Sequence, residues 1–124
     1  MTHNRVCDTS ALVACCLNEP GADMVRQRLY EGGCVMHAVN VSEFCSAMPR
    51  KLPGGFTRAS ALQWLEDAGI KFASGFDLAW ARNVAEIRHA VASLSIGDGV
   101  AITLADALGV PVMASDKADK FAAI

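Results

Sequence analysis

Four carboxylate residues, spread over the whole chain, lie where a predicted strand gives way to a helix or in the first turn of a predicted helix: Asp8, Glu43, Asp98 and Asp116. Asp8 and Asp116 each follow a run typical of a buried strand, so both should emerge at the same edge of a parallel sheet. Glu43 comes shortly after a third such run. Asp98 would lie at this edge only if the helix that it opens begins there.

A shared pocket of these acids would suit a divalent cation. Carboxylates within about 6 Å of one another repel, and a hard cation removes that penalty. Mg²⁺ and Mn²⁺ prefer oxygen ligands, and no set of His or Cys ligands accompanies the acids. One or two such ions held by acids alone indicate metal-assisted phosphoryl chemistry.

The ordinary explanation of each acid is a helix cap. Carboxylates are favoured at helix N-termini by the unpaired backbone N–H groups and the helix dipole, each interaction being worth roughly 0.3–1 kcal/mol. Taken singly, each of the four acids is explained in this way. Only their combination indicates a site.

The elements that would position the acids alternate between strand and helix. Strands are predicted over 3–7, 34–39, 70–74 and 110–114, and helices over 9–17, 22–30, 44–48, 57–68, 77–91 and 99–108. Asn40 with Glu43 fits a capping box before the third helix, and Ser95 with Asp98 fits a second. Pro49 marks a break, and a short charged helix should follow Asp116. This alternation predicts a parallel sheet covered on both faces.

Length and composition bound the remaining possibilities. A chain of 124 residues with 52% hydrophobic residues and no linker indicates one domain, residues 1–124. No apolar run approaches the roughly 20 residues that span a bilayer, and the N-terminus lacks signal-peptide features. We therefore expect a soluble, cytoplasmic protein without a membrane partner. The net charge of −2 means that binding of nucleic acid needs a local basic cluster or bridging metal ions.

The five cysteines indicate neither a zinc site nor a disulfide framework. Their number is odd, they have no metal-ligand spacing, and all lie in apolar surroundings: Cys7, Cys15, Cys16, Cys34 and Cys45. We expect reduced thiols that behave as small hydrophobic residues. His37, within an apolar run, is interpreted as a packed core residue.

Four segments in this order, 6–12, 37–43, 94–98 and 111–116, resemble the PIN-domain ribonucleases, most closely the VapC-like toxins of toxin–antitoxin pairs. The resemblance implies a three-layer α/β fold with a central parallel sheet of four or five short strands flanked by helices. It also implies a metal-dependent endoribonuclease that cleaves RNA phosphodiester bonds, the toxin of a type II pair. Such relatives dimerise and bind an antitoxin protein.

The resemblance assigns roles to individual residues. It implies that Asp8, Glu43, Asp98 and Asp116 are catalytic, that Asp8, Asp98 and Asp116 hold the Mg²⁺ or Mn²⁺, and that the helix of Asp98 begins at the site. Thr9 and Ser10 would support the site beside Asp8, and Asn40 and Ser95 at the helix starts. Arg50, Lys51 and Lys117 are candidate RNA contacts, although an ordinary solvated surface explains them equally well.

The chain departs from the family pattern at a few positions. Ala114 stands two residues before the last acid, where relatives often carry a hydroxyl residue, and Gly97 and Gly99 flank Asp98 where Ala is more usual. The first departure favours an alternative function, a non-catalytic PIN-like module that binds RNA or protein. A third hypothesis, an acidic-pocket phosphoryl-transfer or phosphohydrolase domain, usually needs a pair of Asp residues on the first strand or a Gly-rich phosphate loop. This chain has Asp8 alone on that strand and no such loop.

Overall fold

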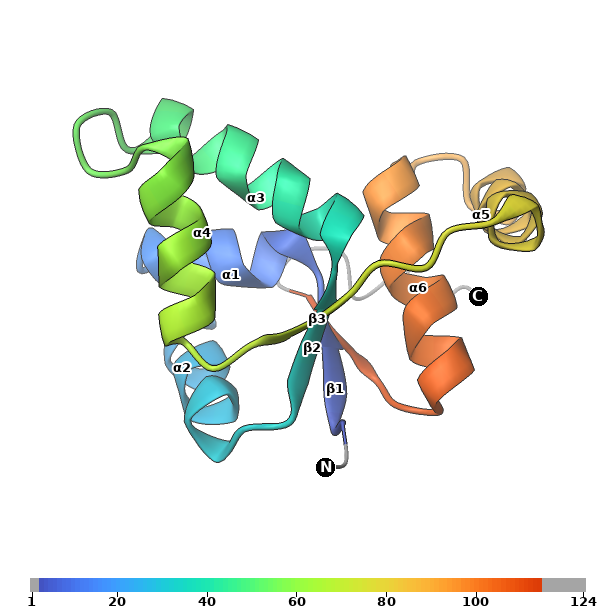
Figure 1. Ribbon diagram of the computed structural model, residues 1–124, viewed down its shortest axis with the longest axis horizontal. Coiled ribbons are helices and arrows are strands. Elements are labelled where there is room, and N and C mark those ends of the chain that lie inside the picture. The colour runs from blue at the N-terminus through green and yellow to red at the C-terminus, as the bar shows by residue number, and fades with distance from the viewer. Residues whose placement is uncertain (1–2, 115–124) are drawn as a thin grey trace.

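Four short parallel strands form the centre of the fold (Figure 1). The structure is a computed structural model that describes residues 3–114. The strands are β1 (Arg5–Cys7), β2 (Cys34–His37), β3 (Lys71–Ala73) and β4 (Val112–Met113), in the order β3-β2-β1-β4. Val6 of β1 is paired with Val35 on one side and Val112 on the other, always in parallel. The predicted parallel sheet is confirmed, and a fifth strand would fall outside the described residues.

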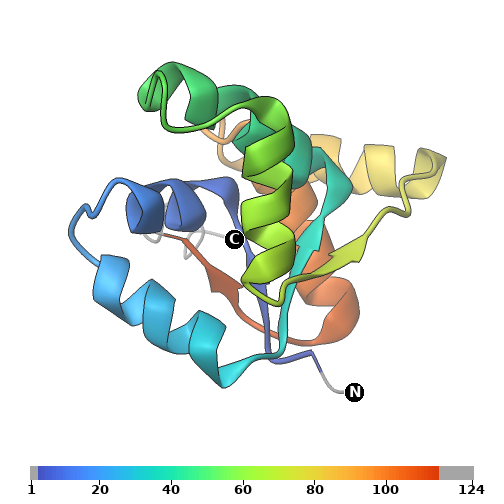
Figure 2. The same ribbon diagram turned by 60° about the vertical axis from the view of Figure 1, so that its left-hand side comes forward.

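Helices cover both faces of this sheet (Figures 1 and 2). The first four lie on one face: α1 (Thr9–Cys16), α2 (Ala22–Glu31), α3 (Ala38–Lys51) and α4 (Arg58–Asp67). On the other face α6 (Ile96–Leu108) contacts β1, β2 and β4, and α5 (Leu78–Ala90) packs against α6. The predicted three-layer α/β architecture is therefore confirmed.

Alternating residues of the strands belong to two different hydrophobic clusters, one on each face of the sheet. Cys7 of β1 packs with Leu12 and Phe44 under α1–α4, whereas Val6 packs with Val35 and Leu104 under α6. Successive side chains of a strand point to opposite faces, so both faces of the parallel sheet are buried. This packing fixes the positions of the strand ends, where the candidate site lies.

The cysteines are free thiols, as the sequence predicts. Cys7, Cys15 and Cys34 are buried, while Cys16 and Cys45 are half-buried. Within residues 3–114, no helix has the length and the apolar content needed to cross a lipid bilayer.

The start of α3 differs from the prediction. The second strand ends at His37 rather than at residue 39, and the helix begins at Ala38, so Asn40 and Glu43 do not form a capping box. The ring of His37 caps the helix instead, because its Nδ1 accepts a hydrogen bond from the Val39 N–H at 3.0 Å. Pro49 was also expected to end this helix, but it lies inside the last turns of α3.

The other boundaries agree with the sequence interpretation to within a few residues. Thr57 and Asp77, predicted as first helical residues, are the N-caps of α4 and α5. The predicted capping box of Ser95 and Asp98 is present, although α6 begins at Ile96 rather than at residue 99. Each strand is shorter than predicted. The short helix expected after Asp116 lies outside the described residues.

Candidate active site

Asp8 stands at the end of β1 and at the start of α1. Its backbone N–H donates to the Met113 carbonyl at 3.0 Å, which continues the pairing of β1 with β4. Its Oδ2 accepts hydrogen bonds from the Ser10 hydroxyl at 2.7 Å and from the Ser10 N–H at 3.3 Å. Asp8 thus caps α1 as expected, but its residue is only 1% exposed.

Asp98 lies in the first turn of α6, three residues after the N-cap Ser95. Its Oδ2 accepts from the Ser95 N–H at 2.8 Å, and its own N–H donates to Ser95 Oγ at 3.1 Å. These reciprocal bonds form the capping box between Ser95 and Asp98. Asp98 is 2% exposed, so its carboxylate is buried as well.

Glu43 brings α3, α1 and α6 together. Its Oε1 accepts hydrogen bonds from Thr9 Oγ1 at 3.0 Å and from Asn40 Nδ2 at 3.1 Å. Its carboxylate lies against the Cα of Gly97, where a methyl group would overlap it. Glu43 therefore reaches between the residue after Asp8 and the residue before Asp98. The start of α6 thus lies beside Glu43, near the carboxyl ends of the strands, a position that the residue pattern alone left open.

Capping does not by itself account for the burial of Asp8 and Asp98. A cap contributes about 0.5–2 kcal/mol, whereas removing an ionised carboxylate from water costs several kcal/mol. The free energy gained by capping is therefore too small to offset the burial of two carboxylates near the same strand ends. Such placement is typical of a functional site.

The chemistry of the donors fits a hard divalent cation. Carboxylates, together with carbonyl and water oxygens, are the ligands that Mg²⁺ and Mn²⁺ prefer. Cys7 precedes Asp8, but its hydrogen bond with Cys34 and its burial raise the pKa of its thiol, so it stays neutral. Within the described part of the chain, no three acidic, His or Cys side chains form a ready metal-binding group. The predicted ligand Asp116 lies outside that part.

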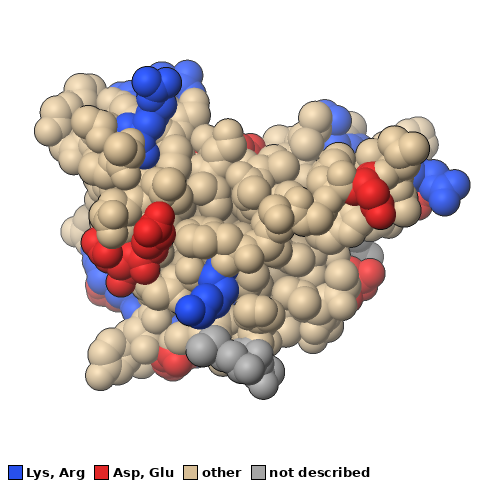
Figure 3. All heavy atoms as spheres, viewed as in Figure 1, with Lys and Arg blue, Asp and Glu red and all other residues tan. Residues whose placement is uncertain are grey.

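The candidate RNA contacts are far from these acids. Arg50 and Lys51 are exposed at the C-terminal end of α3, about 10 Å along the helix from Glu43. Arg50 donates to Ser46 O at 3.2 Å and to Ser46 Oγ at 3.0 Å. Figure 3 shows basic side chains where α3 passes to α4, and a hollow between the α3–α4 and α5–α6 parts. Lys117 lies outside the described residues.

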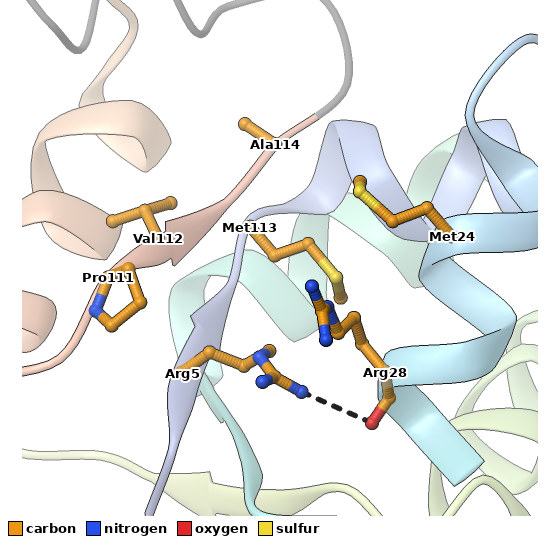
Figure 4. Close-up of a pocket in the computed structure, with 7 residues that line it drawn as sticks. All are labelled: Arg5, Met24, Arg28, Pro111, Val112, Met113 and Ala114. Atoms are coloured by element: carbon orange, nitrogen blue, oxygen red, sulfur yellow. Dashed lines mark hydrogen bonds between the residues drawn. The ribbon is translucent and has the colours of Figure 1, made fainter. Parts of the chain in front are cut away.

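A separate pocket of about 290 Å³ lies between α2 and β4 (Figure 4). Its described lining comprises Arg5, Met24, Arg28, Pro111, Val112, Met113 and Ala114. Arg5 Nη1 donates to the Arg28 carbonyl at 3.3 Å beside it. None of Asp8, Glu43 and Asp98 lines this pocket, so it is not the site that the acids define. Ala114, where relatives often carry a hydroxyl, lines it.

Sequence reasoning missed the contributions of His37 and Gly97. His37 is buried as expected, but it also caps α3 and its Nε2 lies 2.8 Å from the Gly75 carbonyl oxygen. Gly97 stands where Ala is more usual in the family, and the structure shows that it provides the space that the Glu43 carboxylate occupies. Gly in place of the usual Ala was the only feature of the sequence that marked position 97, and it did not show that Glu43 is the residue packed there.

The comparison with protein families agrees with this arrangement. The PIN domain family model matches residues 5–124, so the chain belongs to the PIN domain family. PIN domains are generally nucleases that use divalent metal ions. A search of curated proteins gives no significant match. The closer likeness to VapC-like toxins therefore stays a prediction from the sequence motifs.

Proposed function

We propose that this PIN domain is a metal-dependent endoribonuclease. The observation that supports it best is the position of Glu43, whose carboxylate contacts both Thr9 and Gly97. These two residues are the immediate neighbours of Asp8 and Asp98. Three acids, near the N-terminal ends of three different helices, thus approach one end of the sheet, as a shared site requires.

Asp8, Asp98 and Asp116 are the residues that would hold Mg²⁺ or Mn²⁺, one ion or two. When bound, the cation supplies Lewis-acid activation of water and of the phosphate group. Ser10 fixes the orientation of Asp8, because its hydroxyl and its N–H both donate to Oδ2. Ser95 does the same for Asp98 through its N–H.

Glu43 would act on the attacking water. Its Oε1 already accepts two hydrogen bonds, from Thr9 and Asn40. Among residues 3–114, no hydrogen bond reaches its Oε2, which leaves that oxygen to orient a water and to accept its proton. The hydroxyl and the amide on Oε1 keep the carboxylate from turning away during this step.

Asparagine at position 98 separates catalysis from capping, because its amide oxygen can still accept the Ser95 N–H that Asp98 accepts. We expect the wild type to cleave a fluorescent structured RNA with Mn²⁺ but not with EDTA. Asp98→Asn should fold normally and lose cleavage. Asp106→Asn, at an exposed position later in α6, is the matched control and should cleave normally.

Two results would contradict the proposal: cleavage that persists in EDTA, or an Asp98→Asn variant as active as the wild type. If both proteins bind RNA equally and neither cleaves it, the non-catalytic module is the better description.

We further propose that the enzyme is the cytoplasmic toxin of a type II toxin–antitoxin pair and forms a homodimer. The likeness of its motifs to VapC-like toxins supports this role. Met24 and Tyr30 of α2 and Leu62 of α4 are exposed and offer apolar surface to a partner. Expression of the wild type in bacteria should arrest growth, whereas Asp8→Asn should not. Light scattering should give the mass of a dimer, and a monomer would contradict that part.

A further inference from the structure

We propose that Gly97 is a positioning residue. Its lack of a side chain lets the Glu43 carboxylate lie against the first turn of α6, and this contact holds the carboxylate in its catalytic orientation. This inference rests on the proposed function and deepens it. The catalytic contact belongs to Glu43, and Gly97 acts only through it. Three residues from three different helices surround the carboxylate: Thr9 of α1, Asn40 of α3 and Gly97 of α6.

The backbone conformation does not explain the glycine. Gly97 lies within α6 and is not among the glycines with a positive φ angle. At a helical position, Ala is intrinsically favoured over Gly. The choice of Gly must therefore come from the surroundings. The three atoms nearest to a Cβ added at Gly97 are all from the Glu43 carboxylate: Oε1, Oε2 and Cδ.

Asn40 fixes the distance between Glu43 and α6. It is 0% exposed, and its Nδ2 donates both to Glu43 Oε1 at 3.1 Å and to the Gly97 carbonyl at 3.0 Å. Turning the amide over would place Oδ1 against these two oxygens. The observed orientation persists even though Oδ1 has no hydrogen-bond partner within the described residues. The Nδ2 contacts therefore set the orientation and draw Gly97 towards the carboxylate.

Gly99 provides a matched comparison in the same turn. A Cβ added there would meet Val84 Cγ1 of α5 at 2.8 Å, so Gly99 allows α5 to pack closely against α6. Gly97 faces a carboxylate and Gly99 faces the core. Substitution of either glycine by Ala should thus affect different properties of the protein.

The test is a double-mutant cycle in the full chain, with Gly97→Ala, Glu43→Ala and the double variant. The first readout is the Tm in EDTA, which needs neither metal nor activity. In the Glu43→Ala background the added methyl has room, and we expect Gly97→Ala to raise the Tm by about 3 °C. In the presence of Glu43 we expect no rise, because the methyl displaces the carboxylate.

The second readout is RNA cleavage with Mn²⁺. Gly97→Ala should lower kcat by about tenfold or more with KM changed less than about twofold, because the orientation of a reacting group is lost. In the Glu43→Ala background it should lower kcat no further. Gly99→Ala should show the opposite pattern, a lower Tm with an unchanged kcat.

The inference would be overturned if Gly97→Ala shifted the Tm equally with and without Glu43. It would also be overturned if the Tm shift differed between the two backgrounds but Gly97→Ala left kcat unchanged. If the wild type cleaves no RNA, the proposed function fails, and the Tm cycle alone then decides whether Gly97 positions Glu43.

Discussion

Asn40 of α3 donates a hydrogen bond to the carbonyl oxygen of Gly97 in α6 at 3.0 Å, across a sequence separation of 57 residues. The two helices lie against each other at their N-terminal ends, near the carboxyl ends of the strands. This bond thus joins the element that carries Glu43 to the element that carries Asp98.

Replacement of Asn40 by Leu should destabilise the fold. The similar shape of Leu keeps the packing, but it leaves the Gly97 carbonyl and Glu43 Oε1 without this donor. The expected cost is about 1–3 kcal/mol in the free energy of unfolding, measured by urea denaturation in EDTA. Asn83→Leu should cost less, because its partner Thr103 keeps a 2.8 Å hydrogen bond to the Gly99 carbonyl. Equal costs for the two variants would show that Asn40 has no special structural role.

His37 should be essential to the start of α3. Because Val39 N–H donates to Nδ1, the ring proton is on Nε2 and is donated to the Gly75 carbonyl. His37→Ala removes both bonds and leaves a cavity under Trp80, so we expect a loss of about 2–4 kcal/mol. His37→Asn should recover part of this, since Asn can cap a helix. The exposed His89 of α5 is the matched control, and its replacement by Ala should change stability little.

Cys16 should make stability fall at alkaline pH. Its burial, with a smaller effect of Cys15, raises the pKa of its thiol to about 12. In the unfolded chain the thiol loses its proton near about pH 8.5. Between these values the folded state binds more protons, so the free energy of unfolding decreases as the pH rises. The stabilising contribution is complete below about pH 8.5 and is lost towards pH 12.

Urea denaturation at a series of pH values between about 8 and 10.5 measures this effect. The decrease in the free energy of unfolding should be smaller in Cys16→Ala than in the wild type. Identical slopes in the two proteins would contradict the assignment to Cys16.

Local patterns in the sequence were sufficient for the sheet and for two of the acids. Each strand is a short apolar run, and alternation with helices determines a parallel sheet. Asp8 and the pair of Ser95 and Asp98 were predicted at helix starts because capping depends on residues that are adjacent in sequence. All three have the predicted hydrogen bonds.

The rest depends on contacts between distant segments or on unusual local chemistry. The apolar run over 34–39 continues without a break into α3, and a His ring is an uncommon cap, so the start of this helix was placed too late. Pro49 lies inside α3 although it cannot donate an N–H to the carbonyl four residues earlier, so a Pro residue alone did not mark the end of this helix. The partner of Gly97 is Glu43, and no rule of spacing connects positions so far apart.

The central claim is that Asp8, Asp98 and Asp116 hold a divalent cation. Diffraction from crystals grown with saturating Mn²⁺, at a wavelength where manganese scatters anomalously, tests it most directly. We expect an anomalous peak at about 2.0–2.3 Å from carboxylate oxygens of Asp8 and Asp98, and no such peak in crystals of Asp8→Asn. A map of the wild type without a peak at these carboxylates would contradict the account.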